Sequence, residues 1–412
     1  MRKEIYATLQ VADHEIRILV GELHNGRLYI LKVERVPHTS IVNNEIVSQT
    51  SIVEAIKKAL VNIEKNVKIK VTRVLLVVPS FNLQRINRSL HVDINDPLNR
   101  ILKDNIENLY RLALNQKPVE NMELINAEIY RYKVNGVHVY KVPLNEKAGR
   151  LFAEVDLYYV NRNIVYQLAS IVEQSGLEIL DVCVDQIAVG KEASLYDVNN
   201  QQYIVAMQVE RQATTLGLFY KGRLIHSEII DVSLEKWTQK IVKMFEIPYE
   251  VAVRLMFNNI DLDAKIVHTD PICLWSKEKK NYTCSQQDLM DVVGEDINEF
   301  IDKIKEACQD IISTNQARFV LVGEGSMIKG INNRLAKELN CQVDKYLPST
   351  LGARDGSLVA MLGTFYNHID HRNWQVYKQD SIDEHKDLEL VKNKQDENNI
   401  TKRLKTIFNQ NK

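Results

Sequence analysis

Two stretches of this chain carry the same four residues at the same spacing. GELHNGRL at 21–28 and GLFYKGRL at 217–224 share Gly, Gly, Arg and Leu, and 217 − 21 and 222 − 26 both give 196. Upstream, Gln10-Val11 and Gln208-Val209 match with a link that is two residues shorter. An internal repeat constrains a fold strongly, because each copy must be one structural unit. The repeat predicts a duplicated α/β domain whose second copy begins near the middle of the chain.

The residues around the first copy have the expected α/β character. Residues 5–36 alternate as strands do, and Asn25-Gly26 is a strong hairpin signal because both turn residues need positive φ. A helical stripe covers about 51–65, and the apolar run 71–78 is typical of a strand buried on both faces. The order of strands, helix and buried strand favours an α/β fold.

A different texture begins at Ser80. We expect a strand near 90–94, a helix from about Asp96, a second Asn-Gly hairpin at Asn135-Gly136 and a strand over 151–160. These elements predict a small α+β insert between the first α/β unit and the helix predicted over 163–176.

The stretch 319–335, FVLVGEGSMIKGINNRL, reads as a buried strand, a glycine turn at 323–326 and a helix. Backbone N–H groups at such a turn can bind an anion or a nucleotide. Any strand-to-helix connection also needs a turn, and the turn alone favours that structural interpretation.

The amino-acid composition limits the kinds of protein to which this chain can belong. The 412 residues are 45% hydrophobic and 26% charged, which is ordinary for a globular protein of two or more domains. The net charge of −1 argues against a nucleic-acid partner. Five cysteines without a CxxC pair suggest neither a zinc site nor a disulfide framework. No apolar run approaches the ~20 residues that span a bilayer, so any membrane contact is expected to be peripheral.

The C-terminal region has two parts. Residues 380–399 contain seven acidic and three basic residues and no aromatic residue, which predicts a disordered linker. Residues 400–412 resemble a basic amphipathic helix, the pattern of a membrane-surface anchor. A terminal helix that docks on the protein body is the alternative. The predicted membrane-binding residues are Ile400, Lys402, Arg403, Leu404, Lys405, Ile407 and Phe408.

The duplicated α/β pattern, the late glycine turn, the insert and the tethered tail together resemble the actin-like ATPase superfamily, and within it the FtsA family of bacterial division proteins. Supporting segments, in order, are SIVNNEIVSQTSIVEAIKKAL at 40–60, SGLEILDVCVDQIA at 175–188, IPYEVAVRL at 247–255 and LGARDGSLVAMLG at 351–363. The resemblance implies a duplicated actin-like (RNase H-like) fold with an inserted α+β subdomain 1C (SHS2) and a C-terminal amphipathic helix. The implied subdomains are 1A at 1–79 and 161–197, 1C at 80–160, 2A at 198–225 and 316–379, and 2B at 226–315.

The phosphate loops depart from the pattern of the superfamily, in which both loops read Asp-x-Gly. Gln10-Val11-Ala12 and Gln208-Val209-Glu210 stand there instead, and a neutral amide is a poor substitute for a carboxylate on Mg²⁺. The adenosine turn keeps Gly323 but continues with Glu324, and Val253 and Met256 replace the ribose contacts of the family. A degenerate nucleotide site would consist of Gly323, Gly325, Ser326 and Thr214, beside Gln10 and Gln208. We therefore expect no ATP hydrolysis, although ATP binding without turnover stays open.

The resemblance also implies partners. It predicts an adaptor at the cytoplasmic side of the membrane that recruits the C-terminal peptide of FtsZ and assembles with itself head to tail. The FtsZ peptide is expected on subdomain 2B, where Asp296 replaces an arginine of the family. The candidate contacts are Lys277, Lys279, Lys280 and Glu299. The alternatives are an active ATPase or kinase, in which Asp13 or Asp185 would serve in the cleft, and a PilM-like assembly scaffold.

Overall fold

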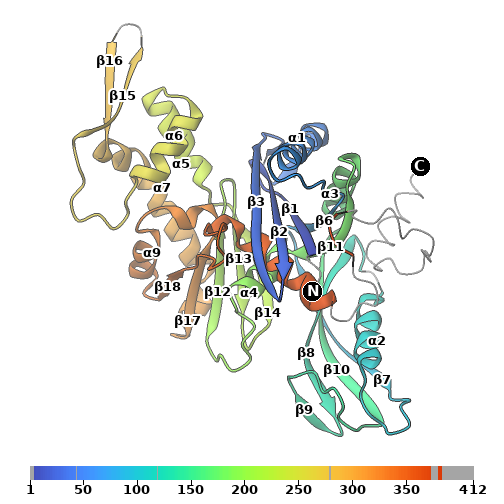
Figure 1. Ribbon diagram of the computed structural model, residues 1–412. Coiled ribbons are helices and arrows are strands. Elements are labelled where there is room, and N and C mark those ends of the chain that lie inside the picture. The colour runs from blue at the N-terminus through green and yellow to red at the C-terminus, as the bar shows by residue number, and fades with distance from the viewer. Residues whose placement is uncertain (1–3, 43, 118, 278–279, 373–378, 383–412) are drawn as a thin grey trace.

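The protein is built around two five-stranded sheets that lie side by side (Figure 1). This computed structural model describes residues 4–42, 44–117, 119–277, 280–372 and 379–382. The first sheet has the order β11-β6-β1-β2-β3 and the second has the order β14-β13-β12-β17-β18. The first contains β1 (Glu4–Val11), β2 (Glu15–His24), β3 (Arg27–Pro37), β6 (Arg73–Val78) and β11 (Glu178–Val184). The second contains β12 (Tyr203–Val209), β13 (Thr214–Phe219), β14 (Leu224–Ile230), β17 (Ala317–Val322) and β18 (Gln342–Lys345).

The two sheets repeat one topology. Each sheet begins with three antiparallel strands that are consecutive in the sequence. A fourth strand then pairs in parallel with the first, and a fifth pairs in parallel with the fourth. Gly21 of β2 pairs with β1, and Gly217 of β13 pairs with β12. Gly26 and Gly222 both have positive φ in the following turn, at 74° and 68°. The sequence repeat is therefore a structural repeat, and the predicted duplication is confirmed.

Two helices join the halves. α4 (Asp185–Glu192) follows the first sheet and contacts the second, whereas α10 (Val359–Arg372) follows the second sheet and packs on β1, β6 and β11. They touch so closely that a Cβ on Gly363 would lie 1.7 Å from the Ala188 carbonyl oxygen. One continuous apolar core consequently includes residues of both sheets. On its outer side the first sheet is covered by α1 (Gln49–Val67) and α3 (Arg162–Gln174).

The segment between β6 and α3 forms a separate four-stranded sheet with its own core (Figure 1). Its elements are β7 (Gln84–Asp93), α2 (Lys103–Leu114), β8 (Met122–Val134), β9 (Val137–Val139) and β10 (Arg150–Asn161). The helix expected from about Asp96 begins only at Lys103. The Asp96 carboxylate instead accepts the backbone N–H groups of Leu98 and Arg100, both at 3.0 Å, which stabilises a turn that is not helical.

The second half carries a helical lobe between β14 and β17. It contains α5 (Leu234–Phe245), α6 (Tyr249–Asn259), α7 (Gln286–Ala307) and α8 (Gln309–Ile312). The β15 (Pro271–Lys277) and β16 (Lys280–Ser285) hairpin projects from this lobe (Figure 1). The remaining elements are the short strands β4 (Ile41–Val42) and β5 (Glu45–Ile46), the 3₁₀ turns η1 (Glu324–Met327) and η2 (Gly356–Leu358), and α9 (Ile331–Leu339). None of the helices in the described part of the chain is long and apolar enough to cross a membrane.

The beginning of the expected linker is not a solvated tether. Ser381 is buried, its hydroxyl accepts the Ala7 N–H at 2.8 Å, and its own N–H donates to the Ile5 carbonyl. Residues 380–382 therefore dock on the first sheet, which corrects the predicted start of the linker. The acidic composition gave no sign of this, because the contact is made by backbone groups and one serine. The rest of the linker and the whole predicted amphipathic helix lie outside the described residues.

Candidate functional site

The two loops that correspond to the phosphate loops face each other across the junction of the halves. Asp13 lies in the β1–β2 turn and Gln212 in the β12–β13 turn. The Gln212 backbone N–H donates to the Asp13 carboxylate, and its side-chain amide donates to the Asp13 and Ile41 carbonyls at 3.0 and 2.9 Å. The loops thus bond directly to one another.

Arg17 of β2 lies fully buried behind these loops. Its Nε donates to Glu15 at 2.6 Å, and its two terminal nitrogens donate to the two carboxylate oxygens of Glu210 at 3.4 and 3.0 Å. Further bonds run to the Gln10 side chain at 3.5 Å and the Ser357 carbonyl at 3.2 Å. A planar guanidinium suits this bidentate arrangement. Arg17 belongs to the first half, whereas Glu210 and Ser357 belong to the second.

Glu324, which follows Gly323 of the glycine turn, points into the same place. Arg211 Nε donates to it at 2.8 Å, and His14 Nε2 lies 3.2 Å from its carboxylate. The His14 Nδ1 atom lies 2.5 Å from Asp13. Glu324 is therefore held by one cation from each half of the molecule.

A third connection runs along the edge of the cluster. Arg35 of β3 lies 2.7 Å from Glu15 and 2.6 Å from Asp355, and it also donates to the Ser357 hydroxyl at 2.7 Å. Asp355 and Ser357 lie at η2, directly before α10. We call the nine charged residues described so far the cleft cluster. They are Asp13, His14, Glu15, Arg17, Arg35, Glu210, Arg211, Glu324 and Asp355.

The pKa values in the cleft cluster follow from burial and charge. Burial by itself lowers the pKa of Arg17, but the carboxylates of Glu210, Glu15 and Glu324 outweigh it, so the pKa is raised. Burial also disfavours the His14 cation, yet hydrogen bonds to Asp13 and Glu324 raise its pKa to about 9. Burial would raise the pKa of Glu324, but His14 and Arg17 hold it well below its usual range. Burial raises the pKa of Glu210, partly offset by Arg17. At neutral pH His14 is thus a cation and Glu324 an anion.

The amide residues at the loops bond to one another or to the cluster. The Gln186 amide nitrogen donates to Gln208 at 3.2 Å, and the Gln10 side chain accepts from Arg17. Asp185, the alternative catalytic carboxylate, begins α4 and accepts the N–H groups of Ser80 and Gln186. Burial raises its pKa to about 6. Asp185 is thus the first residue of α4, after the N-cap Val184, and its carboxylate is bonded within the protein.

The glycine turn packs against its own fold. A Cβ on Gly323 would lie 2.4 Å from the Val209 carbonyl oxygen, and one on Gly325 would lie 2.4 Å from the Val209 side chain. The Gly323 N–H donates to the Gly356 carbonyl at 2.9 Å, and the Ser326 hydroxyl donates to the Gly323 carbonyl at 2.7 Å. The helix expected directly after the turn is a 3₁₀ turn, and α9 begins at Ile331. These glycines are needed for close packing on the end of β12.

The other predicted nucleotide contacts are also occupied within the protein. Thr214 is buried at the start of β13, and its hydroxyl donates to the Val232 carbonyl at 3.0 Å. Val253 and Met256 of α6 are both buried, and Met256 belongs to the apolar core of the helical lobe. The polar groups of the predicted nucleotide-binding residues are therefore bonded within the protein, mostly to residues outside the predicted set.

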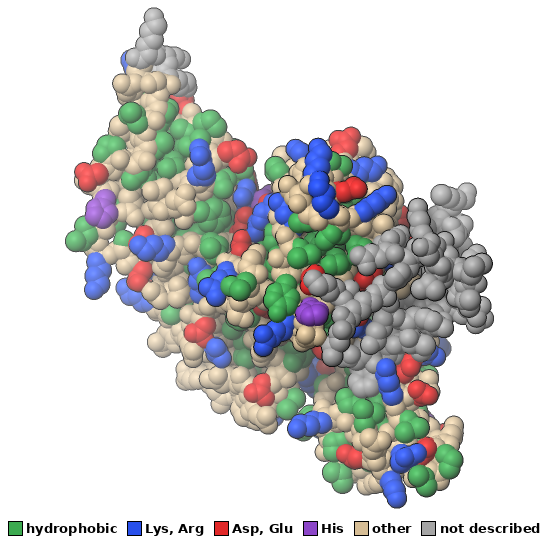
Figure 2. Space-filling view, in the orientation of Figure 1, with side chains coloured by type: hydrophobic (Ala, Val, Ile, Leu, Met, Phe, Trp, Pro, Cys, Tyr) green, Lys and Arg blue, Asp and Glu red, His purple; other side chains and the backbone are tan. Residues whose placement is uncertain are grey.

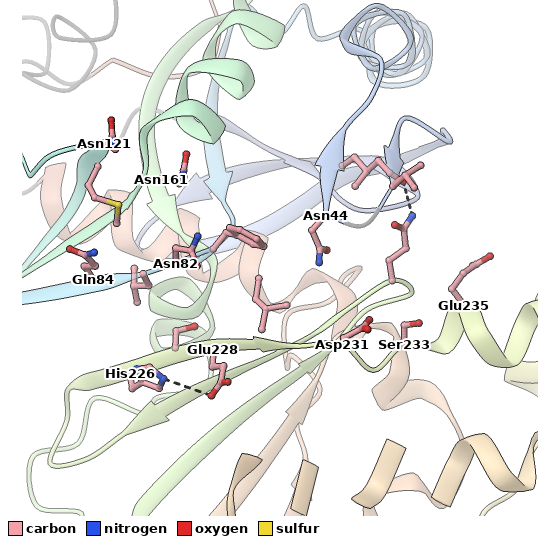
Figure 3. Close-up of a pocket in the computed structure, with 18 of the residues that line it drawn as sticks. Asn44, Asn82, Gln84, Asn121, Asn161, His226, Glu228, Asp231, Ser233 and Glu235 are labelled. Atoms are coloured by element: carbon pink, nitrogen blue, oxygen red, sulfur yellow. Dashed lines mark hydrogen bonds and ion pairs between the residues drawn. The ribbon is translucent and has the colours of Figure 1, made fainter. Parts of the chain in front are cut away.

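A cavity of about 1320 Å³ adjoins the cleft cluster at Gln212. Figure 3 shows that its walls come from the start of the insert, the β4–β5 segment and the end of β14. The described residues that line it include four carboxylates, those of Glu120, Glu228, Asp231 and Glu235, and among these described residues there is neither lysine nor arginine. A polyanion such as a triphosphate would meet unfavourable charge there.

The arrangement does not fit a magnesium nucleotide. Glu210 and Glu324 place carboxylates at the positions that correspond to the second phosphate loop and the adenosine turn, and the fully buried Arg17 already bonds to Glu15, Gln10, Glu210 and Ser357. His14, Glu15 and Glu324 are close enough to hold a metal ion. A metal ligand must be a neutral imidazole, however, whereas His14 is protonated, and both carboxylates pair with arginines.

Sequence reasoning missed Arg17, Arg35 and Arg211. A signal was present: Arg17 interrupts the apolar strand Ile16–Val20, and acidic residues replace the expected small residues at Glu210 and Glu324. A cation within an apolar strand needs a compensating charge, and new carboxylates in two loops are candidates for it.

The predicted partner residues lie apart. Lys280 is exposed on the projecting hairpin, whereas Glu299 lies on α7 beside α5, where it pairs with Lys236 and Lys303. Asp296 is buried and pairs with Lys240 at 2.7 Å. Lys277 ends β15, and Lys279 lies outside the described residues.

Comparison with curated proteins finds relatives along most of the chain. It is 22% identical to the cell division protein FtsA of Bacillus subtilis over 367 residues, which cover 87% of this chain and 82% of the relative. It is 20% identical to FtsA of Streptococcus pneumoniae over 86% of this chain and 78% of the relative. No family model matches the chain. The resemblance to FtsA expected from the sequence is confirmed.

Solved structures show the fold. One chain of the PilM–PilN type IV pilus biogenesis complex aligns with a TM-score of 0.57 at 13% identity, over 88% of this chain and 98% of that one. MreB5 of Spiroplasma citri bound to ADP aligns with a TM-score of 0.55 at 11% identity, over 90% and 97%. The fold is thus the actin-like one that the sequence predicted.

Proposed function

We propose that this protein is a cell-division adaptor that links FtsZ filaments to the cytoplasmic face of the membrane and does not hydrolyse ATP. The observation that carries the proposal is the similarity to FtsA proteins along more than four fifths of the chain. The cleft supports the proposal that the protein does not hydrolyse ATP. Phosphoryl transfer needs Mg²⁺ and positioned donors around the phosphates, and the cleft cluster offers carboxylates and internally bonded amides instead.

The membrane half of the proposal rests on residues 400–412. Burying Ile400, Leu404, Ile407 and Phe408 in a bilayer surface at ~1.5–3 kcal/mol each, reduced for partial insertion, provides several kcal/mol. Lys402, Arg403 and Lys405 would add about 1 kcal/mol apiece beside anionic lipid. A helix this short is marginal in water, so we expect it to form on the bilayer.

Sedimentation with anionic lipid vesicles tests this half. Phe408→Glu places a charge on the apolar face and should abolish pelleting. Asn409→Glu adds the same charge about 100° around the helix, on the polar side, and should weaken pelleting only through electrostatics. Equal loss in both variants, or pelleting of a chain truncated at residue 399, would contradict a tail anchor.

Binding of FtsZ is tested separately. The candidate surface is the basic end of the β15–β16 hairpin, so the triple variant Lys277→Glu, Lys279→Glu, Lys280→Glu should weaken binding of the acidic C-terminal peptide of FtsZ at least tenfold. The matched control is Lys57→Glu with Lys58→Glu, two exposed lysines on α1. Equal affinity in the hairpin variant and the wild type would move the FtsZ site elsewhere.

Self-association is a further part of the proposal. Figure 2 shows hydrophobic side chains at the surface of the helical lobe and of the insert. The exposed large hydrophobic residues of the described chain include Ile266 and Leu274 on the lobe and Val137 and Tyr140 on the insert. Such patches at opposite ends of a molecule suit head-to-tail contacts. Polymers on lipid monolayers should disappear when the insert, residues 80–159, is deleted.

The alternatives make different predictions. An ATPase or kinase of this fold would release phosphate in a magnesium-dependent reaction that a cleft substitution abolishes. A PilM-like scaffold shares the fold. It would bind neither FtsZ nor vesicles through residues 400–412.

A further inference from the structure

We infer that the cleft cluster replaces the nucleotide as the link between the two halves: Arg17 of the first half, bonded to Glu210 and Ser357 of the second, keeps the cleft closed without any ligand. This inference does not depend on the adaptor role. It concerns only how the two halves are joined, and it is carried by the contacts of the cluster.

Arg17 is buried and bonds to both halves of the molecule. Its side chain is 0% exposed, and its donors are shared between Glu15 and Gln10 of the first half and Glu210 and Ser357 of the second. A buried guanidinium is tolerated only when its charge and its N–H groups are satisfied. Separating the halves would remove Glu210 and the Ser357 carbonyl from Arg17, which would keep only Glu15 and Gln10 as partners, so these contacts favour the closed arrangement.

Several connections besides that of Arg17 also join the two halves. The same junction is crossed by His14 to Glu324, by Arg35 to Asp355 and by Asp13 to the Gln212 N–H. Together with Arg17 to Glu210, these make four connections. On one side they come from β1–β2 and β3, and on the other from three separate segments of the second half. Independent connections at one junction act together, because opening the cleft must break all of them at once.

The cleft cluster contains its own anions. In a nucleotide site the protein supplies donors and the phosphates supply the anions. Here Glu210 and Glu324 supply the anions, and Arg17, Arg211 and His14 supply the donors. A triphosphate entering the cleft would compete for the same cations with the Glu210 and Glu324 carboxylates, which are only 14% and 12% exposed, and would have to displace them.

The cluster also reaches the helix that joins the halves. Arg17 and Arg35 both bond to Ser357, directly before α10, and the Gly323 N–H bonds to Gly356. α10 packs tightly on α4 at Gly363. The cluster therefore fixes the start of the connecting helix as well as the two loops.

A double-mutant cycle on the full-length protein tests the link. Arg17→Met should lower the melting temperature by about 5 °C or more, because it leaves buried Glu210 without its cation. The double variant Arg17→Met, Glu210→Gln should lose less than the sum of the single variants. Arg111→Met, which breaks an exposed pair with Glu107 on α2, is the control and should shift the melting temperature by less than about 1 °C. A shift as small as the control, or additive single losses, would overturn the inference.

Measurements on the wild type keep the test decisive if Arg17→Met does not fold. Adding MgATP at millimolar concentration should leave the melting temperature unchanged, since a ligand that binds the native state must raise it. The Gln212 N–H should exchange with deuterium far more slowly than the exposed Asn135-Gly136 turn, with or without nucleotide. A rise of several degrees with MgATP, or fast exchange at Gln212 that nucleotide suppresses, would show that the cleft depends on a ligand. No vesicle or FtsZ enters these assays, so their outcome is separate from that of the adaptor proposal.

Discussion

The protein has two groups of ion pairs that are alike in chemistry and different in setting. In the cleft cluster, the Arg17 side chain is 0% exposed and its partners Glu15 and Glu210 are 10% and 14% exposed. On the helical lobe, Lys236 and Lys240 of α5 pair with Asp296 and Glu299 of α7, and Lys236 is 51% exposed. We call this second group the lobe pairs.

The difference teaches that burial decides what an ion pair does. Water and salt screen exposed pairs, which are worth at most about 1 kcal/mol each. Breaking a buried pair leaves a charge in an apolar site and costs several kcal/mol. The span also differs: Arg17 and Glu210 are 193 residues apart and lie in different halves, whereas Lys236 and Glu299 are 63 residues apart in one lobe. The cleft cluster therefore bears on the whole fold and the lobe pairs on a local surface.

The largest effect is expected for Glu324→Ala. The substitution leaves the Arg211 guanidinium and the His14 cation without their shared carboxylate, and it should reduce the free energy of unfolding by about 3–5 kcal/mol. Urea unfolding followed by circular dichroism measures it. Glu324→Gln keeps the shape and should cost less. A loss below about 1 kcal/mol for the alanine variant would place the cleft cluster in the same class as the lobe pairs.

The next effect is a dependence on alkaline pH. Because the folded-state pKa of His14 is raised from 6.5 to about 9, its contribution is fully present below pH 6.5 and is lost as the pH rises through 9. This corresponds to roughly 3 kcal/mol at most. The charged groups that face His14 are Asp13, Glu15 and Glu324, with His38 nearby.

Comparing the wild type with His14→Gln isolates this contribution. The difference in unfolding free energy between the two proteins should shrink between pH 6.5 and 9.5. A constant difference over that range would mean that His14 is neutral in the folded protein, and the cleft cluster would then lose one of its cations.

An intermediate effect is expected for Lys240→Met on the helical lobe. Asp296 is buried, and Lys240 is its closest cation at 2.7 Å, with Lys236 at 3.3 Å. Since Lys236 can still compensate the charge, the loss should be about 1 kcal/mol. A loss as large as that of Glu324→Ala would show that one buried partner is enough to make a pair costly to break, which would sharpen the comparison.

The smallest effect is expected for Lys303→Ala, which removes an i,i+4 pair with Glu299 on α7. Its cost should be about 0.3–0.5 kcal/mol and should vanish in 1 M salt. The Lys303 ammonium also donates to the Asp231 carbonyl at 3.0 Å. A salt-independent loss would therefore point to that hydrogen bond as the stabilising contact.

The sequence by itself determined the features that local pattern controls. The repeat at an offset of 196 predicted two equivalent sheets, since a glycine at the same place in each copy allows the same positive-φ turn, at Asn25-Gly26 and at Lys221-Gly222. Gln10, Gln208 and Glu210 already argued against a magnesium site, because ligand chemistry depends on residue type. Periodicity placed most strands and helices for the same reason, although it set the start of α2 seven residues too early, at Asp96 rather than Lys103.

Only the tertiary structure decided what these local elements meet. Nothing near Arg17 in the sequence indicates that Glu210 and Ser357 complete its hydrogen bonds, and nothing near Gly323 indicates that Val209 occupies the space of its missing Cβ. Ser381, in a segment with the composition of a tether, is likewise buried by backbone bonds to β1. Local propensity acts over a few residues, whereas burial and charge pairing act between segments that folding brings together from hundreds of residues apart.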